Sequence, residues 1–457
     1  MPESYMFRRA EAPDGSAGGA AHALASFIVN ARDRQLLPAT REVALNCVLD
    51  ALGSAGAAMD VPGVVATCDG AKRLLGRGAV PIWFSGGSGA MGAALLANSA
   101  ATAALDLDDG YRRARGHPGA AVIPAALAML TLRPSLSADE VLRAVVAGYE
   151  VALRVAMARL SYAPSGAWSA YGVIATLGYL QGTSLECLAH ALAIGAQASP
   201  ALPALAGLAG SDVKEGIPYG CLAGLAALEM AAAGATGPTD IFDIPTLFDA
   251  DVALADFGPA PLIEGTYFKP FGCCRHIHGA LDALLLLQRE HGFSVEDIDG
   301  MEVATYRATF NLANRPAPIS LTDAQYSVPF CLAAAAMGGE SALLPLKQPM
   351  LSDPRIVRLA HTVVVRPDPE LESLFPERSP SRLTVTLQTG ERLVSPVVDP
   401  RGDPARPMHR AELVAKFRQV TAHTLGPQQE EVLQGLQQFE QGETAPLVRA
   451  LGLDWTK

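Results

Sequence analysis

The chain has 457 residues, of which 50% are hydrophobic and 6% aromatic, and its formal net charge is −11. This length predicts two or three domains, and the Ala-, Leu-, Val- and Gly-rich apolar content is typical of closely packed helices. The acidic balance argues against nucleic acid and anionic membranes as main partners, although a locally basic site can still bind an anion.

The cysteines and the apolar runs indicate a cellular compartment. Seven cysteines, without metal-ligand spacing, predict reduced thiols in a cytoplasmic protein. The N-terminus lacks the apolar core of a signal peptide. The Ala-rich run at 221–235 contains Glu229 and is predicted to be a buried helix rather than a membrane span.

The first half of the chain is predicted to be almost wholly helical. Residues 1–19 are polar and Gly/Pro-rich and are expected to be a flexible leader. Helical periodicity then runs from residue 20 to about 260, and Ser137 with Glu140 forms a capping box that opens one of the helices.

The pattern changes near residue 264. Strands are expected at 301–307 and 361–366, and the alternation of Leu383, Val385 and Leu387 with polar residues predicts another, followed by a hairpin turn at Thr389-Gly390. After a Pro/Gly linker at 399–407, helical pattern returns in a segment too short to bury a core alone. The sequence therefore predicts a mainly α fold, with an all-helical domain built from residues 20–263 and 404–457 and a smaller α+β lid at 264–403.

The densest group of titratable residues lies in the loop between two apolar helices. It consists of Asp106, Asp108, Asp109, Arg112, Arg113, Arg115 and His117. Acid–base chemistry on an anionic substrate requires groups whose pKa values neighbours can tune. A structural cluster of ion pairs would produce the same pattern, so both interpretations stand.

Five further cations or imidazoles occur at two places. Lys214 lies before a helix, where it would reinforce an anion site or be an ordinary surface lysine. Lys269, Arg275, His276 and His278 lie together, and on a strand the two histidines would share a face. No third ligand has recognisable spacing, so no metal is predicted. Arg275 can bind a carboxylate bidentately, while either histidine can equally be a helix-start or core residue.

Tyr326 precedes an apolar helix. It is either a proton donor or a packed aromatic side chain.

Several of these stretches, taken in order, resemble the MmgE/PrpD family. They are Leu49–Gly53, the DLDD…HPG loop, Lys214 with Gly220, TGPTDIF, FKPFGCCRHIH, QYSVPF and the closing VVDPRGDPARPM before an EL-x2-KF helix. The resemblance implies a helical domain built from both chain ends, an α+β lid, a homodimer, and no metal or organic cofactor.

The resemblance also implies roles for particular residues. Asp106 and His117 match the family's active-site Asp and His, Lys214 and Lys269 its cleft lysines, and Tyr326 a tyrosine of the decarboxylase branch. Three positions depart from that branch: Gly110 replaces a threonine, Ala163-Pro164 replaces His-Pro, and Cys274 replaces a histidine.

These matches predict a lyase that removes an α-proton from a small di- or tricarboxylate. His117, oriented by Asp106, and Tyr326 are the expected catalytic residues. The expected substrate-binding residues are Lys214, Lys269, Arg275, His276 and His278. The first choice is a hydro-lyase like 2-methylcitrate dehydratase; the alternatives are a cis-aconitate-type decarboxylase or an iminodisuccinate-type epimerase. A catalytically silent carboxylate-binding or scaffold protein is the alternative of another class.

Overall fold

The computed structural model describes residues 19–202, 210–255, 257 and 260–457. The predicted leader lies outside these residues except for Gly19, which begins the first helix. The N-terminal part of the chain, up to residue 254, consists of α1 (Gly19–Asn30), α2 (Pro38–Ala57), α3 (Pro62–Leu75), β1 (Val80–Ile82), β2 (Gly87–Gly89), α4 (Met91–Ala103), α5 (Gly119–Leu132), α6 (Ala138–Ala158), α7 (Gly166–Gln181), α8 (Leu185–Ala198), α9 (Ile217–Ala232) and α10 (Ala250–Leu254).

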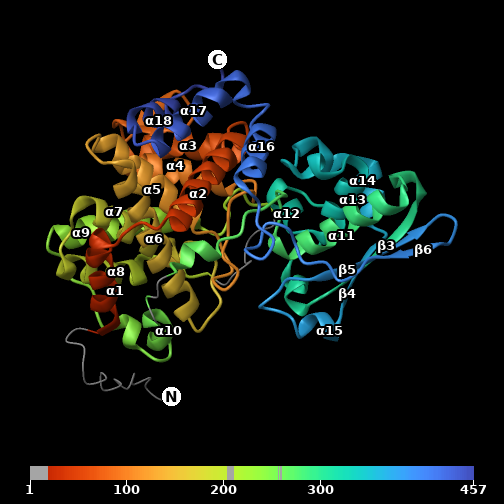
Figure 1. Cartoon of the computed structure of the whole chain (residues 1–457), viewed down its shortest axis with the longest axis horizontal. Coiled ribbons are helices and arrows are strands. Elements are labelled where there is room, and N and C mark those ends of the chain that lie inside the picture. The colour runs from red at the N-terminus through yellow and green to blue at the C-terminus, as the bar shows by residue number, and fades with distance from the viewer. Residues whose placement is uncertain (1–18, 203–209, 256, 258–259) are drawn as a thin grey trace.

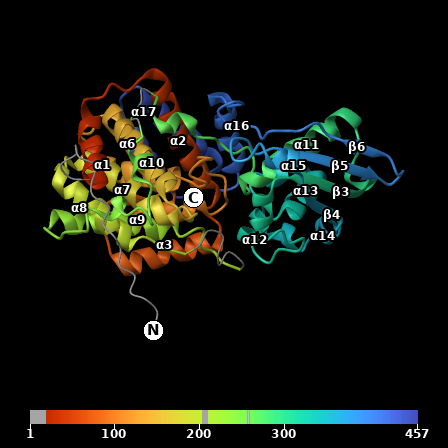
Figure 2. The ribbon, with the colours of Figure 1, turned by 90° about the horizontal axis from the view of Figure 1, so that it is seen from below.

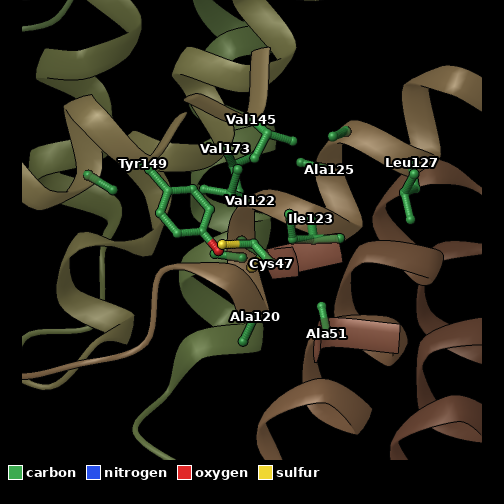
Figure 3. Packing of buried hydrophobic residues seen from close by; sticks show 14 of the residues in the cluster. Cys47, Ala51, Ala120, Val122, Ile123, Ala125, Leu127, Val145, Tyr149 and Val173 are labelled. Atoms are coloured by element: carbon green, nitrogen blue, oxygen red, sulfur yellow. The ribbon is translucent and has the colours of Figure 1, made fainter. Parts of the chain in front are cut away.

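Small residues let these helices approach closely. A Cβ atom on Gly148 of α6 would lie 2.1 Å from Thr176 Oγ1 of α7, and one on Gly224 of α9 would lie 2.5 Å from the Ala170 carbonyl oxygen of α7. Figure 3 shows the resulting packing, in which Val122 and Ile123 of α5 lie among residues of α2, α6 and α7. The Ala/Gly-rich composition is therefore required by the short distances between helix backbones.

The following part of the chain forms a smaller α+β unit. It contains α11 (Arg275–His291), β3 (Ile298–Thr305), α12 (Leu321–Gln325), α13 (Val328–Gly338), α14 (Pro354–Ala360), β4 (Val363–Pro367), α15 (Pro369–Glu372), β5 (Ser381–Leu387) and β6 (Arg392–Val394). The strands pair in the order β4-β3-β5-β6, with β3 parallel to β4 and antiparallel to β5. Leu383 and Val385 point to the buried side of β5, as their alternation with polar residues predicts. The hairpin after residue 387 forms as expected, with Gly390 at a φ of 86°.

The chain then returns to the helices of its first half. The last three helices are α16 (Arg410–Val420), α17 (Gln429–Glu440) and α18 (Thr444–Leu451). Phe417 of α16 packs against Gly53 of α2, and Lys416 donates hydrogen bonds to Asp50 Oδ1 and to the Leu107 carbonyl oxygen, both at 2.7 Å. Figures 1 and 2 show α17 beside the N-terminal helices and α16 beside the junction with the second unit.

Two separate hydrophobic cores result. One contains apolar residues of α1–α10 together with α16–α18, and we call these elements the body. The other contains residues of α11–α14 and β3–β6, and we call these elements, with α15, the lid. The predicted fold class, mainly α with a body from both chain ends and an α+β lid, is thereby confirmed. Among the described residues, the body departs from an all-helical domain by the two-stranded β1–β2 hairpin and a few isolated β-bridges.

No single helix among the described residues is long and apolar enough to cross a membrane. Helices α2 and α3 meet the length and composition criteria only as a pair, which is bent by 100°.

Candidate active site

A pocket lies between the body and the lid. From the body and its connection to the lid, it is lined by Asp106, Arg112, Arg115, His117, Glu215 and Tyr267, among others. From the lid, its lining includes Cys274, Arg275, His276, Asn311, Tyr326 and Phe375. The pocket therefore brings together residues that lie more than 200 positions apart in the sequence.

Asp106 lies just beyond the end of α4, with its backbone in the left-handed region at a φ of 53°. Its Oδ1 atom accepts hydrogen bonds from the ammonium groups of Lys214 and Lys269, the latter at 2.6 Å. Burial opposes ionisation, but the two ammonium groups outweigh it and hold the pKa of Asp106 well below its usual range. Asp106 is therefore an anion in the folded protein.

The two lysines consequently do not take the position predicted for them. Lys214 and Lys269 are buried, at 3% and 0% exposure, and neither lines the pocket. Their charges are used to neutralise Asp106, because a buried carboxylate must be paired. The expectation that they share the pocket wall with His117 is wrong, and they support the site from behind Asp106.

The backbone around His117 determines which ring nitrogen carries the proton. His117 Nδ1 lies 2.8 Å from the carbonyl oxygen of Asp109. A carbonyl oxygen only accepts hydrogen bonds, so Nδ1 carries the hydrogen in the neutral ring and Nε2 has the free lone pair. Nε2 lies 3.6 Å from Asp106 Oδ1 and 3.9 Å from Glu215 Oε1.

The surroundings favour this neutral form of His117. Burial, followed by the charges of Lys214 and Lys269, lowers the pKa of His117 below its usual value. A neutral imidazole with an unprotonated Nε2 at a pocket wall has the form required of a general base.

Glu215 is a site residue that the sequence analysis missed. Its Oε2 accepts hydrogen bonds from the backbone N–H (3.1 Å) and the hydroxyl (2.6 Å) of Ser165, and its Oε1 accepts one from the Tyr326 hydroxyl (3.1 Å). Burial opposes ionisation, but His117 and Lys214 lower the pKa of Glu215. The only sequence signal was its position beside Lys214, since its glycine-flanked loop gives no periodicity.

Tyr326 lies at the end of α12 and is buried at 2% exposure. Burial and the neighbouring Glu215 carboxylate raise its pKa well above the usual tyrosine value. Its hydroxyl therefore keeps its proton at neutral pH and can act as a donor in the pocket.

His276 and His278 lie in the first turn of α11 and not on a strand, so the two side chains do not share a face. His276 lines the pocket, and its Nδ1 lies 2.6 Å from the Tyr306 hydroxyl. His278 is fully buried, does not line the pocket, and its Nε2 lies 3.0 Å from the Cys273 carbonyl oxygen. Direct contact between His278 and a molecule in the pocket is therefore excluded in this arrangement.

Arg275 does line the pocket, but it is not free. Its Nη2 atom donates to Asp403 Oδ1 at 2.7 Å, and its guanidinium lies over the Tyr267 ring. Its Nε atom has no hydrogen-bond partner among the described residues. One donor of Arg275 is thus left unpaired among the described residues, but it is shielded from solvent.

The three departures from the decarboxylase branch fall in or near the same pocket. A Cβ atom on Gly110 would lie 2.3 Å from the Tyr267 hydroxyl, so a threonine cannot occupy position 110 unless Tyr267 moves. Cys274 lines the pocket, and burial raises the pKa of its thiol to about 12. Ala163 is buried beside the pocket residue Tyr162.

Asp106, Asp108 and His117 also offer a possible metal-binding set. One ligand atom from each lies within 4.8 Å of the others. The ammonium groups of Lys214 and Lys269 already contact the Asp106 carboxylate and would repel a cation there. These residues therefore do not fit a metal ion well.

Comparison with known families assigns the chain. Residues 22–257 match the model of the MmgE/PrpD N-terminal domain, and residues 271–439 match that of the MmgE/PrpD C-terminal domain. The chain belongs to the MmgE/PrpD family. The second match includes α16 and most of α17, which pack in the body. The boundary between the two family models in the sequence therefore differs from the boundary between the two hydrophobic cores. No curated protein is significantly similar in sequence to this chain.

Membership of the MmgE/PrpD family supports a lyase-type or dehydratase-type function in general. It does not assign a substrate.

Proposed function

We propose that this MmgE/PrpD protein is a cofactor-independent hydro-lyase that removes water from a small hydroxy-carboxylate. The observation that carries the proposal is the free Nε2 lone pair of His117 in a pocket that also contains the protonated hydroxyl of Tyr326. Elimination of water needs one group that accepts the α-proton and one that protonates the leaving hydroxyl.

In the proposed reaction, His117 Nε2 accepts the α-proton and becomes an imidazolium. Asp106 and Glu215, whose carboxylate oxygens lie 3.6 and 3.9 Å from Nε2, then stabilise the new positive charge. The Tyr326 hydroxyl, which Glu215 holds in place, gives its proton to the departing hydroxyl group. The arginines that line the pocket bind the substrate carboxylates and stabilise the enolate-like charge.

Epimerisation is the second candidate, because it begins with the same proton abstraction and returns the proton to the other face of the carbon. Tyr326 would then be the returning donor, which the same contact with Glu215 supports. Decarboxylation is less well supported, since Gly110 and Cys274 replace two side chains of the decarboxylase branch. As the resemblance implies, we also propose that the protein acts as a homodimer.

The test is incubation of the purified protein with hydroxy-dicarboxylates and hydroxy-tricarboxylates, with the ultraviolet absorbance of the new conjugated double bond as the readout. Turnover should be lost about 10²- to 10⁴-fold in His117→Gln, the usual contribution of a general acid or base. Exchange of substrate deuterium with solvent, followed by mass spectrometry and not accompanied by a new double bond, would indicate epimerisation rather than elimination. Absence of both turnover and exchange would favour a catalytically silent carboxylate-binding protein.

A further inference from the structure

The pocket has two ends of different charge. At the buried end, Glu215 Oε1 lies 3.1 Å from the Tyr326 hydroxyl and 3.9 Å from His117 Nε2, and the Glu215 side chain is 9% exposed. At the solvent-exposed end lie the guanidinium groups of Arg112 and Arg115. A ligand that spans the pocket therefore meets a carboxylate at one end and guanidiniums at the other.

The cationic end carries more positive charge than its neighbours neutralise. Asp403 lies 2.7 Å from Arg275 and 3.5 Å from Arg112, so one carboxylate serves two guanidiniums. Arg115 lies over the ring of Tyr162 and makes no ion pair within the described part of the chain. Three arginines and one aspartate leave a formal excess of two positive charges, which suits two carboxylate groups of a ligand.

The anionic end carries the opposite excess. Asp106, Asp108 and Glu215 approach the His117 ring, and Lys214 and Lys269 are the cations in contact with this group. Three carboxylates and two ammonium groups leave one negative charge. A ligand carboxylate at this end would be repelled, whereas a hydroxyl or ammonium group would donate a hydrogen bond to Glu215.

The backbone holds these groups in place at an energetic cost. Asp106, Arg115 and Glu215 have φ angles of 53°, 54° and 53°, in the left-handed region that non-glycine residues rarely adopt. Such conformations persist where the surrounding structure determines them, and they concentrate at functional sites.

We propose that Glu215 is a specificity-determining residue, and that the pocket takes a dicarboxylate whose carboxylates face the arginines and whose hydroxyl or ammonium group faces Glu215. This proposal rests on the proposed function, since it concerns the same pocket. It narrows that function, because a tricarboxylate such as 2-methylcitrate would direct a third carboxylate toward Glu215.

The test measures binding and does not need turnover. Isothermal titration calorimetry of the full-length protein with malate, aspartate and citrate gives the dissociation constants of a hydroxy-dicarboxylate, an amino-dicarboxylate and a hydroxy-tricarboxylate. The wild type should bind malate or aspartate at least 10-fold more tightly than citrate. Glu215→Gln should reduce this ratio at least 10-fold, mainly through tighter citrate binding.

Two further variants give the matched controls. Arg115→Gln should weaken binding of all three compounds to a similar extent and leave the ratio unchanged, because it removes charge from the carboxylate end. Glu302→Gln, on the exposed face of β3 where Glu302 pairs with Arg366, should change neither affinity nor ratio. If Glu215→Gln does not fold, Glu215→Asp keeps the charge at a shorter reach and should retain the preference for dicarboxylates.

The proposal is overturned if the wild type prefers citrate, if none of the three compounds binds at millimolar concentration, or if Glu215→Gln leaves the ratio unchanged. Failure of the reaction is separately visible. If the protein prefers dicarboxylates in a way that depends on Glu215 but shows no turnover and no deuterium exchange, the proposed hydro-lyase reaction is refuted. The proposed role of Glu215 in specificity is then supported. If the protein turns substrate over but the Glu215→Gln change leaves the ratio of dissociation constants unchanged, the hydro-lyase reaction is supported and the role of Glu215 in specificity is refuted.

Discussion

Asp109 is a buried carboxyl group next to the proposed base, and its ionisation should control the pH dependence of stability. Its Oδ1 accepts a hydrogen bond from the Gly119 N–H at 3.0 Å, and its Oδ2 accepts one from the Tyr149 hydroxyl at 2.5 Å. Tyr149 lies in turn beside the Cys47 thiol (Figure 3). Burial, followed by the charge of Asp50, raises the pKa of Asp109 from 3.8 to about 7.

The sign of the effect follows from the raised pKa. Between pH 4 and 7 the unfolded chain releases this proton, while the folded protein still holds it. The contribution of Asp109 to stability is therefore complete below about pH 4, falls as the pH rises, and is lost above about pH 7. The difference between 3.8 and about 7 corresponds to about 4 kcal/mol, at ~1.4 kcal/mol per pH unit.

The change that tests this is Asp109→Asn, which keeps the shape but cannot ionise; its amide oxygen can accept from the Gly119 N–H, and its amide NH2 group can donate to the Tyr149 hydroxyl. Urea unfolding of the wild type and the variant should be measured at several pH values from 5 to 8. The free energy of unfolding of the wild type relative to Asp109→Asn should fall by about 3 kcal/mol over this range, mostly below pH 7.

Asp353→Asn is the matched control for this experiment. Asp353 caps the start of α14, is partly buried, and has a pKa lowered to about 2, chiefly by its hydrogen bonds from Arg355. Its ionisation is complete by pH 5, so the corresponding difference should stay constant from pH 5 to 8. A constant difference for Asp109→Asn as well would refute the reasoning.

Three other changes test the site and the fold. Lys269→Met removes one of the cations that lower the pKa of His117, so the acidic limb of the pH profile of kcat/KM should move to higher pH, and unfolding should cost about 3–5 kcal/mol less, as for a broken buried pair. Gly110→Thr should reduce stability by about 1–3 kcal/mol in thermal unfolding, since its Cβ atom displaces the Tyr267 hydroxyl, and Tyr267→Phe should partly restore it. Phe417→Ala should lower the free energy of unfolding by about 3–5 kcal/mol in urea if α16 belongs to the core of the body; a value below 1 kcal/mol would contradict that.

Periodicity was enough to predict most of the fold. Alternation along Leu383 to Leu387 and the turn at Gly390 identify β5 and its hairpin, because a half-buried strand must show one apolar face. The return of the C-terminal helices to the body follows from their small apolar content, which cannot form a core alone. The sequence left the structure at His276 and His278 open for a local reason: two imidazoles separated by one residue carry no period, and the helix there begins without a side-chain cap.

The candidate site was only partly predictable, because it forms where the two units meet. Charge density identified the loop of Asp106 and His117, and the connection to the lid identified Arg275. Glu215 reaches the pocket through a backbone with positive φ and contacts Tyr326, which comes from another unit 111 positions later. Neither the spacing of side chains nor a hydrophobic period in the sequence predicts a contact of this kind between two units.

The lysines show the physical limit most directly. A buried cation and a buried anion both require partners, and the chain can supply the partner itself or leave it to a ligand. Lys214 and Lys269 find theirs in Asp106, whereas Arg115 is exposed, lies over the Tyr162 ring and makes no ion pair within the described part of the chain. A charged side chain that is paired within the protein supports the structure of the site, whereas one that is left unpaired at the pocket can bind the substrate. The tertiary fold determines which of these partners a side chain has, so residues of the same charge can have different roles in one site.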